Sequence, residues 1–181
     1  MIFEPTPLKG VYIIGLELKT DNRGGFARVF CKKEFEQIGH TKEFVQINHS
    51  YNTLKGTVRG MHYQNPPYKE IKLIRCVRGA VSDVVVDIRQ GSPTFLQHLR
   101  VELSDENKRM LYIPEGFAHG FQSLSDKSEL IYHHTEFFTP EADNGLNYKD
   151  PLLNLKWELP VSAISDKDQH SAFITTNFKG I

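Results

Sequence analysis

The sequence predicts an all-β fold, a jelly roll or related barrel of short strands with a few short helices. Short apolar or alternating runs recur along the whole chain, which is the pattern of strands buried on one or both faces. Turn signals such as Arg78-Gly79 separate these runs by too few residues for helical crossovers, so antiparallel pairing is favoured. A jelly roll is one common way in which many short strands avoid exposed sheet edges.

Apolar patterning predicts where the individual strands and helices lie. The predicted strands are Val11–Leu18, Phe26–Phe30, Phe44–Asn48, Ile71–Val77, Val81–Ile88, Leu96–Leu103, Met110–Ile113 and Leu130–His134, with a further strand-like stretch at residues 59–64. Helix signals are few: Lys33–Ile38 suits about two turns, and Ser104–Arg109 and Pro140–Gly145 about one turn each. The polar tail after Trp157 either wraps the barrel or lies loosely on it.

Length, composition and charge indicate one globular domain spanning residues 1–181. The chain is close to the usual domain size of about 150 residues, with 39% hydrophobic and 24% charged residues. Twenty-two basic residues balance twenty-two acidic ones, so no whole-molecule field attracts nucleic acid or anionic membranes. The only cysteines, Cys31 and Cys76, fit neither a disulfide framework nor a zinc cluster. With no long apolar run in the sequence, we expect a cytoplasmic protein.

Two histidines on separate predicted strands are the first candidates for a site. Arg59 and His62 lie three positions apart in a strand-like stretch, and such positions face opposite sides of an extended strand. They serve one site only if a bulge intervenes, which Gly60 permits. His62 and Gln64 share a face, and His119 begins another strand after a Pro-Gly turn.

The spacing around these histidines resembles the two motifs of the cupins. Gly56 lies six residues before His62, and the second motif, P-x-G-x-x-H, is matched by Pro114-x-Gly116-x-x-His119. Metal-binding cupins place a second histidine where Gln64 stands here, and two imidazoles alone make a poor metal site. We therefore expect no metal, and acid–base chemistry is favoured over a purely structural role for the histidines.

Further matches over nearly the whole chain resemble one cupin family, the dTDP-4-dehydrorhamnose 3,5-epimerases. They are Asp21-x-Arg23-Gly24, Phe44-Val45-Gln46-x-Asn48-x-Ser50, Val58-Arg59-Gly60-x-His62-x-Gln64, Lys72-Leu73-x-Arg75, Asp83-Val84-x-Val86-Asp87-Ile88-Arg89, Ser92-Pro93-Thr94-Phe95, Ser104-x-Glu106-Asn107-Lys108-Arg109, Ile113–Phe121, Tyr132 and Ser165-x-Lys167-Asp168. The resemblance implies an isomerase that inverts C3, C5 or both in a nucleotide-linked 4-keto-6-deoxy sugar similar to dTDP-4-dehydro-6-deoxyglucose. It also implies deoxysugar and lipopolysaccharide biosynthesis, and a homodimer with shared active sites.

The expected chemistry is proton transfer beside a ketone, which needs no cofactor. A histidine with an ordinary pKa of ~6.5 suits the base, and the resemblance assigns this role to His62, with Asp168 fixing its tautomer. It assigns Tyr132 to return the proton on the opposite face. Lys72 is the best candidate to stabilise the enolate. The structural alternatives are a solvated turn carboxylate for Asp168, a core tyrosine for Tyr132 and an outward lysine for Lys72.

The resemblance also implies a set of substrate-binding residues, each of which has a purely structural alternative. Positive side chains suit the diphosphate, polar ones the sugar and nucleotide, and aromatic ones stacking on a base or sugar. The expected residues are Arg23, Arg59 and Lys167 for the diphosphate; His119 for sugar or phosphate, with Asp83 as its partner; Gln46 and Asn48 for the nucleotide end; and Phe26 and Phe138 for stacking.

Three expected binding positions depart from the family pattern. Arg28 stands where the family commonly has a glutamate that contacts the nucleotide, Phe138 replaces a tyrosine, and Asp143 replaces a glutamate. These departures leave the proposed base, acid and cation in place but leave the nucleotide and the sugar open.

Other functions also remain open at this point. They are a single-centre 3- or 5-epimerase, a cupin 3,4-ketoisomerase acting on another 4-keto sugar nucleotide, a metal-dependent cupin oxygenase and a non-catalytic sugar-binding cupin.

Overall fold

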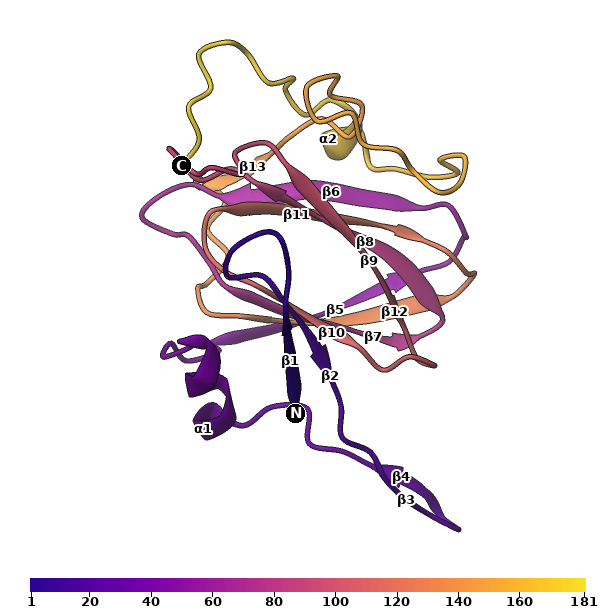
Figure 1. Cartoon of the computed structure of the whole chain (residues 1–181). Coiled ribbons are helices and arrows are strands. Elements are labelled where there is room, and N and C mark those ends of the chain that lie inside the picture. Colours follow the sequence, from indigo (N-terminus) through magenta and orange to yellow (C-terminus); the bar gives the residue numbers. More distant parts are fainter.

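The computed structural model describes all 181 residues and confirms the all-β prediction. Two antiparallel sheets face each other, with strand orders β1-β2-β10-β7-β12-β5 and β13-β6-β11-β8-β9, and a small hairpin, β3-β4, projects from them (Figure 1). The strands are β1 (Ile2–Pro5), β2 (Tyr12–Gly15), β3 (Lys19–Asp21), β4 (Gly24–Phe26), β5 (Gln46–Asn52), β6 (Val58–Gln64), β7 (Lys72–Arg78), β8 (Ala80–Asp87), β9 (His98–Ser104), β10 (Met110–Ile113), β11 (Phe117–Ser123), β12 (Ser128–His134) and β13 (Asp143–Gly145).

Three local predictions need correction. Phe26–Phe30 is not a strand beyond Phe26, because the Phe30 ring packs against Phe35 and Phe44 and draws the chain inward. Ser104–Arg109 is a turn closed by reciprocal hydrogen bonds between Ser104 and Asn107, and not a helix. Pro140–Gly145 is not helical either, since its last three residues form β13 along the edge of β6.

The helix predicted at Lys33–Ile38 is present as two short pieces. They are α1 (Lys32–Phe35) and the 3-10 helix η1 (Glu36–Ile38), which Gly39 ends in the left-handed region. A further short helix, α2 (Asp166–Gln169), lies in the C-terminal tail, where the sequence patterns predict none. No helix is long and apolar enough to cross a membrane.

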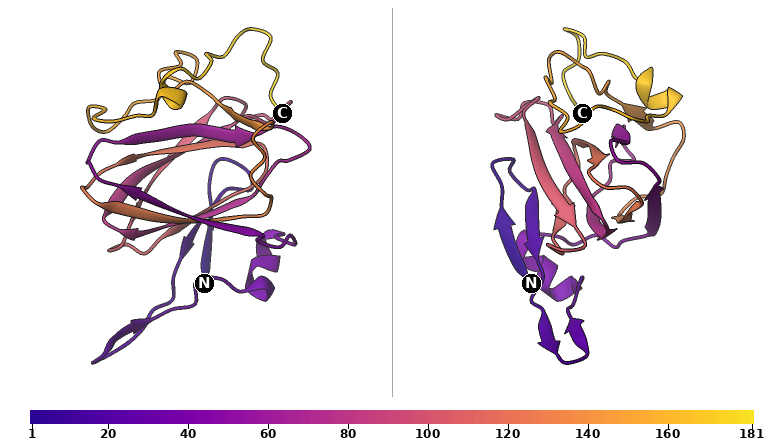
Figure 2. Two further views of the ribbon diagram at one scale, coloured as in Figure 1. Left: turned by 180° about the vertical axis from the view of Figure 1, so that it is seen from behind. Right: turned by 90° about the vertical axis from the view of Figure 1, so that its right-hand side faces the viewer.

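The C-terminal tail wraps the outer face of the five-stranded sheet (Figure 2), which decides between the two alternatives left open by its polar sequence. Leu155, Trp157 and Phe178 from the tail pack on a buried cluster that includes Val84 and Val86 of β8. Strand β8 is therefore covered on both faces, which explains its nearly unbroken apolar sequence. The tail also brings α2 beside β6.

The outer face of the six-stranded sheet is covered only in part within one chain, where Phe35 and its neighbours pack on Leu73, Met110 and Tyr112. Ile47, Tyr51 and Val77 are large apolar residues that remain exposed, and a shallow depression of about 210 Å³ lies nearby, lined mostly by apolar residues that include Leu73 and Ile131. The uncovered sheet face is the rest of this face, defined by Ile47, Tyr51, Val77 and Ile131.

Strand β6 bends at Gly60, as its sequence predicts. The register against β11 shifts between the pairs His62–His119 and Arg59–Phe121. Gly60 has a φ of +111°, and a Cβ added to it would lie 2.6 Å from the Cα of Gly120. Only glycine fits here, because a side chain would meet both an unfavourable φ and a backbone contact. The shift lets Arg59 and His62 line the same cavity.

We predict that Gly60→Ala lowers the free energy of unfolding by about 2–4 kcal/mol, since it adds backbone strain to a steric clash. Gly39→Ala is the matched control: Gly39 also has a positive φ, but a Cβ added there would have no atom within 4 Å. We expect Gly39→Ala to lower the free energy of unfolding by only about 1 kcal/mol. Urea unfolding measures both, and equal losses would contradict the close approach of β6 and β11.

Candidate active site

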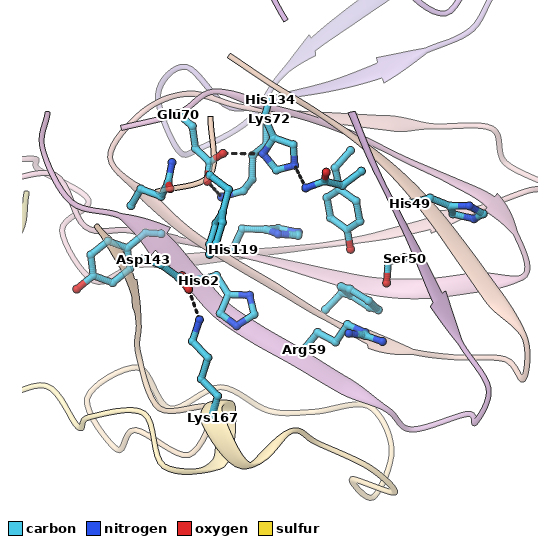
Figure 3. A pocket seen from close by; sticks show the side chains of 16 residues that line it. His49, Ser50, Arg59, His62, Glu70, Lys72, His119, His134, Asp143 and Lys167 are labelled. Atoms are coloured by element: carbon cyan, nitrogen blue, oxygen red, sulfur yellow. Dashed lines mark hydrogen bonds and ion pairs between the residues drawn. The ribbon is translucent and has the colours of Figure 1, made fainter. Parts of the chain in front are cut away.

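A cavity of about 370 Å³ opens between the two sheets (Figure 3). It is lined from strands of both sheets, from α2 and from the loops before β7 and after β12. Nine of the residues expected at the site line it: His62, Lys72, Tyr132, Asn48, Arg59, His119, Phe138, Asp143 and Lys167.

The pairing of His62 with Asp168 is present and joins residues that are distant in sequence. Nε2 of His62 lies 2.6 Å from Oδ1 of Asp168, and the backbone N–H of Gly60 donates to Oδ2 at 3.0 Å. Ser165 caps α2 by accepting from the backbone N–H of Asp168, which fixes this turn against β6. Asp168 is 3% exposed and is therefore a buried partner, not a solvated turn carboxylate.

Asp168 is held in its ionised form. Burial alone would raise the pKa of its carboxyl, but hydrogen bonds and charge attraction from His62, with the Gly60 N–H, lower that pKa overall. An ionised carboxylate only accepts hydrogen bonds, so Nε2 of His62 must carry a hydrogen. In the neutral imidazole the free lone pair then lies on Nδ1, which makes no hydrogen bond within the chain. His62 thus offers a proton acceptor.

His119 forms a second histidine–carboxylate pair, with the expected partner Asp83. Nε2 of His119 lies 2.9 Å from both carboxylate oxygens of Asp83, which is fully buried on β8. Burial raises the pKa of Asp83 above its usual value, although His119 and Lys72 oppose this. The His119 ring also stands edge-on to Tyr132, with centroids 6.0 Å apart.

Lys72 points into the cavity but is not the lone ammonium that its apolar neighbours suggest. Its Nζ lies 2.7 Å from Oε1 of Glu70, and Oε2 of Glu70 lies 2.6 Å from Nδ1 of His134. Burial opposes ionisation of Glu70, but the charge of Lys72 and the His134 hydrogen bond lower its pKa to about 2. Lys72 is therefore a buried cation with an ionised partner.

Tyr132 reaches the cavity from β12, in the sheet opposite the one that carries His62. Burial raises the pKa of this phenol well above its usual range, and the negative charge of Asp83 adds to the effect. Tyr132 therefore keeps its proton at neutral pH and is able to donate it.

Charged and aromatic groups lie at the rim of the cavity. Arg59 is exposed and is oriented by Asn52, whose Oδ1 accepts from its Nε at 2.7 Å. Lys167 of α2 forms an ion pair with Asp143 of β13. Phe138 is exposed, and its backbone N–H donates to Oε1 of Gln46 at 3.1 Å. Lys167, Asp143 and Phe138 thus lie near Gln46 and Gln64 at one end of the cavity, and Arg59 lies near Asn52 at the other.

Known proteins resemble this chain in both sequence and structure. The chain matches the family described as dTDP-4-dehydrorhamnose 3,5-epimerase over residues 5–175. The dTDP-4-dehydrorhamnose 3,5-epimerase of Shigella flexneri is 47% identical over 164 residues, which is 90% of each chain. The chain belongs to the dTDP-4-dehydrorhamnose 3,5-epimerase family. The match confirms the resemblance inferred from the sequence motifs.

Two further relatives of this epimerase bear on its fold and chemistry. A crystal structure of the dTDP-6-deoxy-D-glucose-3,5-epimerase of Legionella pneumophila, in complex with dTDP-4-keto-L-rhamnose, superposes with a TM-score of 0.90 and 40% identity, covering 95% of this chain and 92% of that one. This confirms the cupin jelly roll. A dTDP-4-dehydrorhamnose 3-epimerase of Streptomyces niveus is 35% identical over 175 residues, or 96% of this chain and 84% of that one.

Four expected binding residues of the epimerase do not line this cavity. One of them, Gln46, contacts Asn48 and the backbone of Phe138 at its rim. Arg23 and Phe26 lie on the projecting β3-β4 hairpin, and Arg28 follows it. Arg23 pairs with Asp21, while Arg28 pairs with Glu34 at 2.8 Å. Within one chain these three side chains do not line the cavity, because the hairpin extends away from both sheets.

Sequence patterns do not predict roles for Glu70 and His134, whereas Gln64 lines the cavity on the same face as His62, as expected. The sequence suggests Glu70 only as a metal ligand in a variable loop, and His134 only as the end of a strand. Both line the cavity, and their alternation with Ile71 and His133 is the signal that places them inward. Gln64 bonds to the backbone of Phe137 and Thr139 and so secures the loop after β12.

No group of three or more His, Cys, Asp or Glu side chains in the chain is arranged to hold a metal ion. The cavity histidines are instead each within hydrogen-bond distance of one carboxylate, as described for His62, His119 and His134. These pairs use one ring nitrogen of each histidine.

We predict that Asp168→Asn lowers the free energy of unfolding at pH 7 by about 1–3 kcal/mol, since an amide cannot accept from both His62 and Gly60. The loss should shrink as the pH falls below about 3.8, because a carboxyl with a lowered native pKa stabilises the fold only while it is ionised. Urea unfolding from pH 7 to pH 3 measures this. Asp166→Asn, which changes an exposed carboxylate on the same helix, is the control and should change stability by less than about 0.5 kcal/mol. A pH-independent loss would contradict the charged pairing.

Proposed function

We propose that this epimerase, with residues 1–181 acting as one domain, inverts C3 and C5 of a dTDP-linked 4-keto-6-deoxy sugar. The reaction removes a proton beside the C4 ketone and returns one on the opposite face, for deoxysugar and surface polysaccharide synthesis. One observation supports this most strongly: Nε2 of His62 pairs with the buried, ionised Asp168, which leaves Nδ1 of the neutral ring as the nitrogen that can accept a proton. Family membership and the sugar nucleotide in the Legionella relative support the substrate class.

His62 is the proposed base. Proton transfer from carbon to Nδ1 makes an imidazolium, and the nearby Asp168 carboxylate stabilises that positive charge. The electron pair left by the proton moves into the ketone and makes an enolate with its charge on the C4 oxygen. Lys72 is the proposed cation for this oxygen, because a fixed charge stabilises the enolate more than the ketone.

Tyr132 is the proposed acid for the opposite face. It lies in the sheet facing His62 and keeps its proton at neutral pH. When Tyr132 donates its proton to the carbon, the enolate becomes the ketone again and the carbon has inverted configuration. His62 then holds one proton more and Tyr132 one fewer, so a proton must return between them through solvent before the next inversion. The hydrogen gained by the sugar therefore originates from water.

The charged rim of the cavity suits the nucleotide diphosphate. We propose that Arg59 and Lys167 bind it from opposite ends of the cavity, with Phe138 stacking near Lys167 and His119 bonding sugar or phosphate. Asn48, Gln46 and Asp143 complete the polar contacts. The glutamate-to-arginine departure at Arg28 does not alter the charge of its own cavity, because that side chain lies elsewhere.

A single-centre epimerase is the second candidate, and one finding favours it. The Streptomyces niveus relative is a 3-epimerase with 35% identity, so family membership alone does not set the number of centres. A 3,4-ketoisomerase is less well supported, since that reaction gives no role to a tyrosine placed opposite the base.

We further propose a cytoplasmic homodimer in which the sites are completed by the partner chain. The projecting hairpin carries Arg23 and Phe26 away from their own cavity, as exchange between subunits requires. The uncovered sheet face is apolar and suits contact with a second copy. Both cysteines are free, in keeping with a reducing compartment.

Incubation with dTDP-4-keto-6-deoxyglucose in heavy water should place deuterium at C3 and C5, located by NMR or mass spectrometry. His62→Asn should slow this exchange by about 10²-fold or more while the fold stays intact. His98→Asn changes a histidine on β9 outside the cavity and should exchange at the wild-type rate. Deuterium at C3 alone would favour the 3-epimerase. No deuterium at either carbon, with several nucleotides tested, would refute the epimerase activity.

The dimer is tested by placing a charge on the uncovered sheet face. Wild-type protein should sediment at twice the mass of one chain, and Ile47→Lys should shift it towards the monomer, because a charge in an apolar interface is costly. Leu152→Lys alters an equally exposed apolar residue in the tail and should leave the dimer intact. A monomeric wild type would contradict the proposal.

A further inference from the structure

An ion pair and a series of hydrogen bonds connect Lys72, deep in the cavity, with the backbone of Phe138 at its rim. Oε1 of Glu70 forms the ion pair with Nζ of Lys72 at 2.7 Å, and Oε2 of Glu70 lies 2.6 Å from Nδ1 of His134. The series continues from Nε2 of His134 to Nδ2 of Asn48 at 3.3 Å. Nε2 of Gln46 then lies 3.3 Å from Oδ1 of Asn48, and Oε1 of Gln46 accepts from the Phe138 N–H at 3.1 Å. Figure 3 shows the Glu70 end of this series beside Lys72 and His134.

The direction of every bond in this series is fixed by its two ends. The backbone N–H of Phe138 can only donate, and the ionised Glu70 can only accept. Each amide between them accepts on its oxygen and donates from its nitrogen, so the donors all point towards Glu70. His134 must then carry its hydrogen on Nδ1 and accept on Nε2. If His134 carried a hydrogen on both ring nitrogens, its Nε2–H would face the Nδ2–H of Asn48, and neither group could accept.

We propose that Glu70 and His134 are a positioning pair, which orients the Lys72 ammonium and, through Asn48 and Gln46, fixes the rim of the cavity at Phe138. The pair links the end of the cavity where the ketone is converted to an enolate with the end where the nucleotide stacks. Neither residue needs to touch the reacting atoms for this. The inference rests on the proposed function, because it assigns a purpose to the orientation of Lys72.

Charge balance around Lys72 supports a role for Glu70 beyond packing. The charged and titratable groups facing this ammonium are Glu70 before β7, His134 and Tyr132 on β12, and the Asp83–His119 pair from β8 and β11. Glu70 is the group in direct ion-pair contact with Lys72. A buried ammonium that loses such a partner loses its proton at lower pH, and only the protonated lysine stabilises an enolate.

A glutamine at position 70 gives the sharpest test, because it keeps the size and removes the charge. With its oxygen towards Lys72, its N–H faces Nδ1 of His134, which must become an acceptor. Every later bond then reverses, and the series ends with the Gln46 amide N–H facing the Phe138 N–H. With its oxygen towards His134 instead, its N–H meets the Lys72 ammonium. Either orientation leaves a donor without an acceptor.

The experiment measures exchange of C3 and C5 hydrogens in heavy water against pH, for wild type, Glu70→Gln and Glu70→Asp. The alkaline pH at which activity is lost should be about one unit or more lower in Glu70→Gln than in the wild type. We also expect this variant to have a lower kcat and a raised KM. Glu70→Asp keeps the charge and should retain the wild-type alkaline limit. Glu158→Gln, which breaks the exposed pair with Arg100, is the matched control and should leave the profile unchanged.

The imidazole ¹⁵N spectrum of the wild-type protein tests the same series without any turnover. We expect His134, assigned by loss of its signals in His134→Gln, to show Nδ1–H and an unprotonated Nε2. In Glu70→Gln the hydrogen should move to Nε2. A wild-type His134 with Nε2–H, or a Glu70→Gln variant with an unchanged alkaline limit, would overturn the inference. Absence of exchange in the wild type would instead refute the proposed function, with the ¹⁵N result still standing.

Discussion

Asp168 carries a negative charge where water cannot solvate it, and the arrangement around it determines what the cavity can do. An unpaired buried carboxylate would be costly, so His62 and the Gly60 N–H must both lie within reach. These demands bring α2, near the end of the chain, against the middle of β6. They also fix the His62 tautomer, which leaves Nδ1 of the neutral ring free to accept a proton.

The same constraint recurs at two other histidines of the cavity, His119 and His134. Asp83 is paired with His119, and Glu70 is shared between His134 and Lys72. Each buried carboxylate faces a group that can be positive, so the interior holds several charges at close quarters without an unpaired one. A charge pattern of this kind is fixed before the substrate arrives, and such preorganisation is the usual source of transition-state stabilisation.

Backbone geometry makes these contacts compatible with a barrel. A regular strand would place Arg59 and His62 on opposite faces, and the shift at Gly60 puts both at the cavity. The close contact of Gly60 with Gly120 brings β6 and β11 together behind His62. On the far side of β6, the tail covers the sheet with Trp157 and its neighbours, so the position of Asp168 is supported by apolar packing.

Residue order was enough to predict most of the strands and to show that Gly60 permits a bulge, because side-chain alternation is a local property. Its motifs resemble one family, and that resemblance placed His62, Tyr132 and Lys72 in one site. Long-range packing brings Glu70 and His134 to the same site, since their pairing depends on β7 and β12 lying side by side. It also placed Arg23 on a hairpin that leaves its own cavity. Pairing across strands and the direction of a hairpin depend on long-range packing, which residue order alone does not fix.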